Sequence, residues 1–189
     1  DALGKPISEI FADVAPKGFA ASIGQVHRAF LKDSPTEPVA VKVQYPSLRS
    51  NLENDLLLLG LLSTTLKGKA ARKSGLDFDL NCYREELRRS LLNELDYRHE
   101  LCSLQRAHLH WKDSTQIEIP CAIERYCGSE ILTMSWLEGN PWTWLAEQDQ
   151  EIKNQAAELL LRFFLTNWLQ HGEFHADPHA GNFRFRLKN

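Results

Sequence analysis

The strongest constraint on what this chain can fold into is the octet from His175 to Asn182, which reads HADPHAGN. Asp177 stands two residues after His175 and five residues before Asn182. Phosphoryl transfer accounts for this spacing, because a tight loop then presents a carboxylate to the attacking group and an amide oxygen to a metal ion on the phosphates. The octet therefore predicts Asp177 as the catalytic base or water-positioning group and Asn182 as a metal ligand.

A distant segment from Pro38 to Gln44 reads PVAVKVQ and predicts a strand. Alternation along a strand puts its three valines on one face and Ala40 and Lys42 on the other. This is the layout of the kinase strand whose Ala lines the adenine pocket and whose Lys reaches the phosphates. A solvent-facing or edge Lys is the alternative for an isolated segment of this kind, but the octet favours the nucleotide role.

The segment from Phe19 to His27 reads FAASIGQVH and stands where an ordinary kinase carries a glycine-rich phosphate loop. It holds a single glycine, and Ala20, Ala21 and Ser22 occupy the loop positions. An alanine-rich loop has less backbone freedom than a glycine-rich one, so we expect altered phosphate binding. The alternative is that the two alanines pack beneath a hairpin.

Four blocks occur in the order of a known family: Ala20 to His27, Val39 to Pro46, Glu94 to Asp96, and His175 to Asn182. On these blocks the chain resembles the UbiB-type atypical kinases, which are tied to ubiquinone and other isoprenoid-lipid metabolism. The resemblance implies a protein-kinase-like α+β fold with helices inserted in its N-lobe. Residues 1–138 would form this N-lobe, and residues 139–189 would begin the C-lobe. No Lys-x-Gly-Gln motif precedes the loop and no Asp-Phe-Gly follows the octet, so we expect a fold truncated at both ends.

The resemblance also implies ATP and Mg²⁺ as cofactors and assigns roles to further residues. Glu100 becomes the ion-pair partner of Lys42, and Glu94 and Asp96 join Gln25 in a family motif. Met134 and Trp136 belong to the hinge beside the nucleotide, and His175 braces the catalytic loop. On a straight helix Glu94 points away from Asp96 and Glu100, so the alternative is a solvated face with a Glu94–Arg98 pair.

Hydrophobic periodicity and turn residues give a coarse prediction of the remaining elements. A long helix is expected from Asp79, because five large apolar side chains recur at three- and four-residue steps. The predicted strands are Gln25 to Leu31, Val39 to Gln44, Ile117 to Ile123 and Ile131 to Leu137, with a turn from Lys32 to Pro38. The other predicted elements are helices from Asn51 to Lys67 and from Ala156 to Gln170, and a loop from Lys67 to Gly75.

Composition limits which binding partners and which cellular compartment we expect. A net charge of −3 gives no argument for nucleic-acid binding. Four cysteines without paired C-x-x-C spacing suggest reduced thiols in an intracellular compartment, either a bacterial cytoplasm or an organelle interior. No apolar run is long enough to span a bilayer, so any membrane contact would be peripheral or made by segments outside this chain. Isoprenoid lipids or proteins of lipid biosynthesis are the partners that the resemblance implies.

Three alternatives to an atypical ATPase or small-molecule kinase stay open. His171, His175 and His179 recur every four residues and, together with Asp177, could bind zinc, but Pro178 interrupts any regular helix through the histidines. A phosphotransferase of the aminoglycoside or choline kinase type has a similar catalytic loop. A catalytically silent pseudokinase scaffold would carry the same residues.

Overall fold

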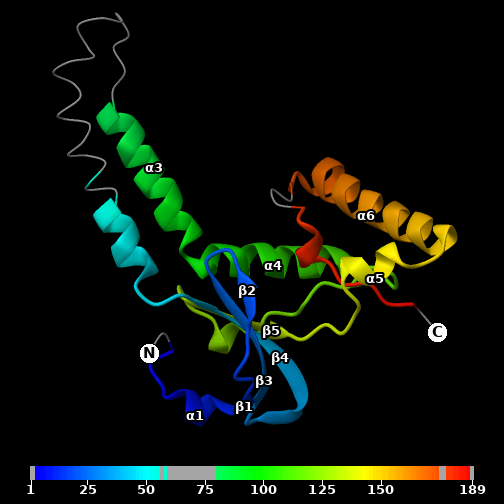
Figure 1. Cartoon of the computed structure of the whole chain (residues 1–189), viewed down its shortest axis with the longest axis horizontal. Coiled ribbons are helices and arrows are strands. Elements are labelled where there is room, and N and C mark those ends of the chain that lie inside the picture. Colours follow the sequence, from blue (N-terminus) through cyan, green and yellow to red (C-terminus); the bar gives the residue numbers. More distant parts are fainter. Residues whose placement is uncertain (1–2, 56–57, 59–79, 175–177, 188–189) are drawn as a thin grey trace, which may run out of the picture. The chain divides into compact units, whose positions relative to one another are not determined.

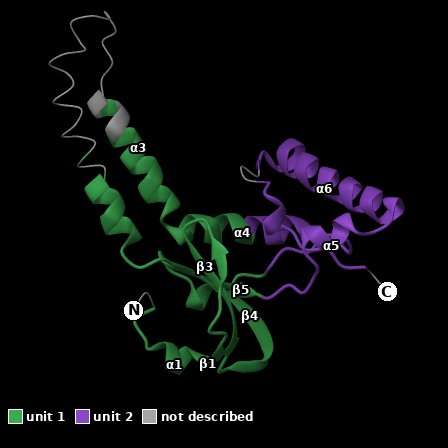
Figure 2. Cartoon of the chain, in the orientation of Figure 1, with its two compact units in different colours: residues 1–105, 121–135 green, residues 106–120, 136–189 purple. Residues whose placement is uncertain are grey.

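The computed structural model describes residues 3–55, 58, 80–174 and 178–187. The chain divides into two compact units, one of residues 1–105 and 121–135 and the other of residues 106–120 and 136–189 (Figure 2). The division predicted after residue 138 stays a prediction.

The first unit is built on an antiparallel sheet in the order β1-β3-β4-β5, with β2 also paired to β3 (Figure 1). Two of the predicted strands, β3 and β4, form its long central hairpin, because alternating apolar residues give each of them one face to bury. The elements are α1 (Ile7–Ile10), β1 (Phe11–Val14), β2 (Phe19–Ala21), β3 (Gly24–Leu31), β4 (Ser34–Gln44) and β5 (Ile131–Ser135).

The turn of this hairpin is shorter than predicted. The turn was expected to run from Lys32 to Pro38, but β4 already begins at Ser34. Prolines cannot donate to a β ladder, which is why the sequence suggested a loop here. The register shifts at the end of the hairpin, where Phe30 pairs with Pro38 and Leu31 with Ser34. This irregularity lets the strand continue through its prolines.

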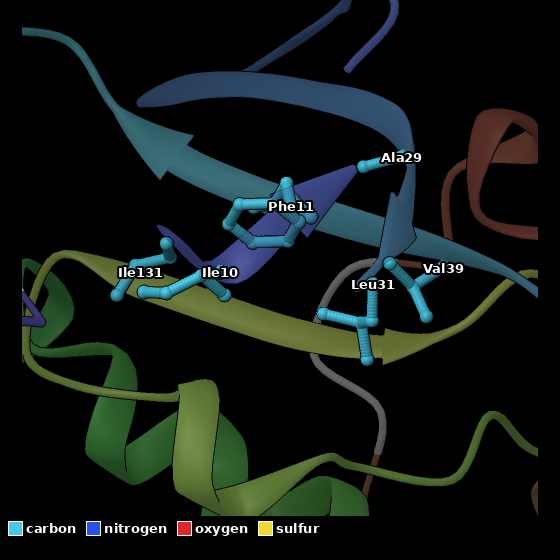
Figure 3. Packing of buried hydrophobic residues seen from close by; sticks show 7 residues of the cluster. Ile10, Phe11, Ala29, Leu31, Val39 and Ile131 are labelled. Carbon is cyan, nitrogen blue, oxygen red and sulfur yellow. The ribbon is translucent and has the colours of Figure 1, made fainter. Parts of the chain in front are cut away.

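The core of the first unit lies on one face of the sheet and against α1 (Figure 3). Val39 and Val41 of β4 are 3% and 5% exposed, so the predicted valine face packs in this core. The same alternation turns Lys42 to the other face of the strand. The buried core residues are Ile10, Phe11, Ala29, Leu31, Val39, Val41 and Ile131.

The long helix predicted from Asp79 is in fact two helices, α3 (Leu80–Glu94) and α4 (Tyr97–Trp111). Asp96 stands at the break, and its Oδ1 accepts the backbone N–H of Arg98 at 3.0 Å. An Asp in this position satisfies an amide at the start of a helix, so it favours a new helix over continuation of the old one. Leu95 is buried, 8% exposed, in the same break. The prediction of one straight helix was therefore wrong.

The strand predicted from Ile117 to Ile123 was also wrong. Only an isolated bridge forms there, between Ala122 and Met134 of β5. The N–H of Cys121 donates to the Ser135 side-chain hydroxyl at 2.9 Å, so a side chain replaces one ladder partner. A short 3₁₀ turn, η1 (Glu124–Tyr126), follows, and β5 ends two residues before its predicted end.

The second unit contains α5 (Trp142–Ala146), α6 (Gln150–His171) and the 3₁₀ turn η2 (Ala180–Asn182). The helix predicted from Ala156 begins six residues earlier, because Asp149 caps it by accepting the N–H of Ile152 at 3.0 Å. Gly172 ends α6 with a φ of 65°.

Residues 48–55 are helical, which agrees with the start of the predicted Asn51–Lys67 helix. The remainder of that prediction, apart from Leu58, and the loop predicted from Lys67 to Gly75 lie outside the described residues. Among the described helices, none combines the length and apolar character needed to cross a bilayer.

Candidate functional site

An ion pair between β4 and α4 forms the centre of the site in the first unit. Lys42 Nζ lies 2.7 Å from each carboxylate oxygen of Glu100. The Lys42 side chain is 16% exposed and the Glu100 side chain 43%. The structure thus has the pairing expected from the resemblance, although Glu100 lies on a separate helix and not on a continuation of α3.

Tyr97, which the sequence analysis did not single out, also contacts the Lys42 ammonium. Lys42 Nζ lies 4.8 Å from the centroid of the Tyr97 ring, within the range of a cation–π contact. The Tyr97 side chain is only 1% exposed. Burial, and then the nearby Glu100 charge, raise the pKa of its phenol to about 12, so the ring is neutral at physiological pH. The sequence does carry a signal for this residue: on a helix, Tyr97 lies three positions before Glu100, so both side chains share one face.

Strand pairing brings other predicted nucleotide residues into the same sheet. Ala40 pairs with Met134 of β5, and Lys42 pairs with Leu132. Ala40 is 8% exposed. Met134 is therefore the cross-strand neighbour of Ala40, and Ala40 lies two residues before Lys42 on β4. Trp136 belongs to the second unit.

The alanine-rich segment is a tight hairpin. Ala20 and Ala21 lie in β2 and pair with Gln25 and Gly24 of β3, while Ser22 lies in the connecting turn. Ala20 and Ser22 are exposed and Ala21 is half-buried. The exposed position of Ala20 is at odds with the alternative in which both alanines pack beneath the hairpin.

Gln25 of the family motif is held within this hairpin. Its side-chain Oε1 lies 3.1 Å from His27 Nε2, and His27 Nδ1 lies 2.9 Å from the carbonyl oxygen of Ala15. A Cβ on Gly24 would lie 2.0 Å from the carbonyl oxygen of Val43. The one glycine of the segment is therefore explained by the close approach of β3 to β4.

The break between α3 and α4 is fixed by polar contacts. Asp96 accepts hydrogen bonds from the Arg98 guanidinium at 2.6 to 3.0 Å. These bonds hold the pKa of the Asp96 carboxyl at about 2. Arg98 therefore pairs with Asp96, and the alternative Glu94–Arg98 pair is not the one observed; Glu94 ends α3 and is exposed. The Gln44 side chain donates to the carbonyl oxygen of Leu95 and ties the break to the end of β4.

The predicted catalytic loop is described only in part. Asn182 is exposed at the end of η2, and His179 Nδ1 accepts the N–H of Gly181 at 3.0 Å. His175 and Asp177 lie outside the described residues. Glu173, just before them, is paired with Arg106 of α4 at 2.5 Å.

Within the described part of the chain, His, Cys, Asp and Glu side chains do not gather in groups of three or more that could hold a metal ion. Two residues of the zinc alternative, His175 and Asp177, lie outside that part. Asn182 offers an exposed amide, whose oxygen is of the hard type that Mg²⁺ prefers.

Comparison with known proteins adds independent evidence on the family of this chain. A family model of the ABC1 atypical kinase-like domain matches residues 1–189. The Arabidopsis thaliana chloroplastic protein Activity of BC1 Complex Kinase 1 is 34% identical over 189 residues, which cover 95% of this chain and 26% of the relative. AarF domain-containing protein kinase 1 of Xenopus tropicalis is 32% identical, with 95% of this chain and 34% of the relative covered.

A solved structure shares the fold. It is Rv3197 of Mycobacterium tuberculosis in complex with erythromycin, with a TM-score of 0.78, 28% identity, and coverage of 97% of this chain and 45% of that one. Together with the family model, this neighbour confirms the predicted α+β kinase-like fold. The chain spans about a quarter to a third of the length of the curated relatives named here. The family resemblance indicated by the motifs is likewise confirmed: the chain belongs to the ABC1 atypical kinase-like family, also known as UbiB or AarF.

Proposed function

We propose that this chain forms the nucleotide-binding part of an atypical kinase or ATPase that uses Mg-ATP. The observation that carries the proposal is the Lys42–Glu100 pair, in which both carboxylate oxygens lie 2.7 Å from one ammonium. A strand lysine held by a helix glutamate is the arrangement with which kinases present a cation to the phosphates. Membership of a kinase-like family supports the same conclusion.

In this proposal each predicted residue takes a role suited to its chemistry. Lys42 contacts the α- and β-phosphates, and the hairpin at Ala20, Ala21 and Ser22 covers them. Ala40 and Met134 line the adenine side together with Trp136. Asn182 would hold Mg²⁺, which would supply neutralisation of the phosphate charge. Asp177 accepts a proton from, or orients, the attacking group, and His175 braces its loop.

We further propose that the complete protein supports ubiquinone or other isoprenoid-lipid metabolism in an organelle or a bacterial cell. The named relative from Arabidopsis is chloroplastic, which supports an organelle. Lipid or lipid-biosynthesis partners and peripheral membrane contact would involve segments outside this chain. A small-molecule phosphotransferase is the second candidate, favoured by the complex of Rv3197 with the small molecule erythromycin.

The test uses the complete protein and compares Lys42→Ala with Lys32→Ala. Both variants remove one positive charge from the same hairpin, but Lys32 is exposed in its turn. Mg-ATP should raise the melting temperature of wild type and Lys32→Ala. In Lys42→Ala the loss of a charge-assisted contact of about 1.5–3 kcal/mol should weaken binding roughly 10- to 100-fold. An unchanged ATP-dependent shift in Lys42→Ala would remove Lys42 from the site.

A second arm separates chemistry from binding. Asp177→Asn should abolish ATP hydrolysis while nucleotide affinity is retained, because the side chain acts on the reacting group alone. Phosphate release and binding constants are measured side by side. A wild-type protein that binds Mg-ATP but shows no turnover with any lipid or small-molecule acceptor would favour the pseudokinase scaffold.

A further inference from the structure

The first turn of α4 surrounds the Lys42 ammonium on two sides. Glu100 provides the carboxylate at 2.7 Å, and Tyr97, three residues earlier, provides a ring whose centroid is 4.8 Å away. Residues three apart on a helix share a face, so one turn supplies both groups. The Lys42 ammonium therefore has an anion and an aromatic face as neighbours.

The Tyr97 ring is held rigidly in this place. Its side chain is 1% exposed, and its backbone N–H donates to the carbonyl oxygen of Ser129 at 2.9 Å. A Cβ on Gly24 would lie 3.0 Å from the Tyr97 hydroxyl oxygen, so the hairpin closes over the ring. The ring is therefore buried beside the hairpin, and the long Lys42 side chain places its ammonium over it.

The contact with Lys42 does not depend on the Tyr97 hydroxyl. The buried hydroxyl of Tyr97 has no hydrogen-bond partner among the described residues. An unpaired buried hydroxyl destabilises a fold, so phenylalanine would fill the same space at lower cost. Tyrosine and phenylalanine share the aromatic face that contacts Lys42, and that face is the feature with a direct relation to the site.

We propose that Tyr97 is a positioning residue for Lys42, a role that rests on the proposed binding of nucleotide at that lysine. A Lys ammonium has three N–H donors, and the two Glu100 oxygens occupy part of this set. The π face attracts the cation without accepting a conventional hydrogen bond. Tyr97 thus limits the motion of Lys42 and leaves a donor free for a phosphate oxygen.

The test compares Tyr97→Phe with Tyr97→Leu in the complete protein, with Mg-ATP as the probe. Phenylalanine keeps the aromatic face and removes only the unpaired hydroxyl, so affinity should stay within about twofold of wild type. Leucine keeps an apolar side chain without a π face. We expect Tyr97→Leu to weaken Mg-ATP binding by roughly 2- to 30-fold, the range that cation–π contacts span.

A double-mutant cycle then distinguishes positioning from general destabilisation. In a Lys42→Ala background Tyr97→Leu should have no further effect on Mg-ATP affinity, because its effect passes through the lysine. An equal loss in both backgrounds would overturn the proposal. So would an unaltered affinity in Tyr97→Leu when Lys42→Ala alone weakens binding.

A nucleotide-free measurement keeps this proposal separate from the proposed function. The ring should shift the NMR signal of the Lys42 ε-methylene upfield in wild type and Tyr97→Phe, and the shift should disappear in Tyr97→Leu. If Lys42→Ala leaves Mg-ATP binding intact, the nucleotide role of Lys42 fails, and the ring-current shift alone decides whether Tyr97 positions the ammonium. A Lys42 signal that does not differ between the Phe and Leu variants would overturn the positioning role.

Discussion

Replacing Gly24 by alanine should destabilise the first unit more than the same substitution at the half-buried Gly18. The new Cβ would lie 2.0 Å from the Val43 carbonyl oxygen and 2.9 Å from its carbonyl carbon. Ordinary contact begins near 3.4 Å, so β3 and β4 must separate by more than about 1 Å. Overpacking should lower the free energy of unfolding by about 1–3 kcal/mol, and a weakened hydrogen bond beside the Gly24–Gln44 pair by about 1 kcal/mol. The expected loss of stability is therefore about 2–4 kcal/mol.

Gly18→Ala is the matched control. Its Cβ would meet the His27 imidazole at 2.7 Å, and this ring can turn away only by giving up its contacts with Gln25 and Ala15, whereas a strand backbone cannot turn away at all. We expect Gly18→Ala to lower stability by about 1 kcal/mol, less than Gly24→Ala. Melting temperature and amide exchange along β3 and β4 of the complete protein measure both variants. Equal, small effects would refute the view that strand packing accounts for Gly24.

Two further predictions concern the helix break and a thiol. Asp96→Ala should lower stability by about 1 kcal/mol through loss of the cap, whereas Asp96→Asn keeps the cap and loses the charge. Because Arg98 lowers the pKa of Asp96 to about 2, the charge stabilises the fold above pH ~4 and stops doing so as the pH falls toward 2. The stability difference between wild type and Asp96→Asn should shrink over that range in urea titrations; a constant difference would contradict the ion pair. Burial raises the pKa of the Cys127 thiol, so at pH 8 a disulfide reagent should modify the exposed Cys121 well before Cys127, and equal rates would contradict its burial.

The central hairpin and the position of Lys42 could be predicted because they follow from local alternation. Val39 and Val41 bury one face of β4, and Lys42 then has to lie on the other. The partner on α4 was expected only through the family resemblance. No periodicity in the sequence brings Glu100 to Lys42, which lies 58 residues away.

The strand predicted around Ala122 and the single long helix failed for related reasons. Apolar spacing reports which side chains can be buried, but it does not report where the backbone finds its partners. At Cys121 a side-chain hydroxyl takes the place of a ladder partner, and at Asp96 a carboxylate starts a second helix. In both places a polar side chain competes with regular backbone hydrogen bonding.

The helix break also gives the three carboxylates a different arrangement from the one that a straight helix implies. On one continuous helix Glu94 would point away from Asp96 and Glu100, and all three could not serve one site. With the break, Glu94 ends α3, Asp96 caps α4, and Glu100 lies on the first turn of α4. Asp96 therefore contributes to the site by starting the helix that carries Glu100. A cap that fixes where α4 begins also fixes which residues of its first turn face Lys42, so the short Glu94–Asp96 segment influences the ion pair without contacting it.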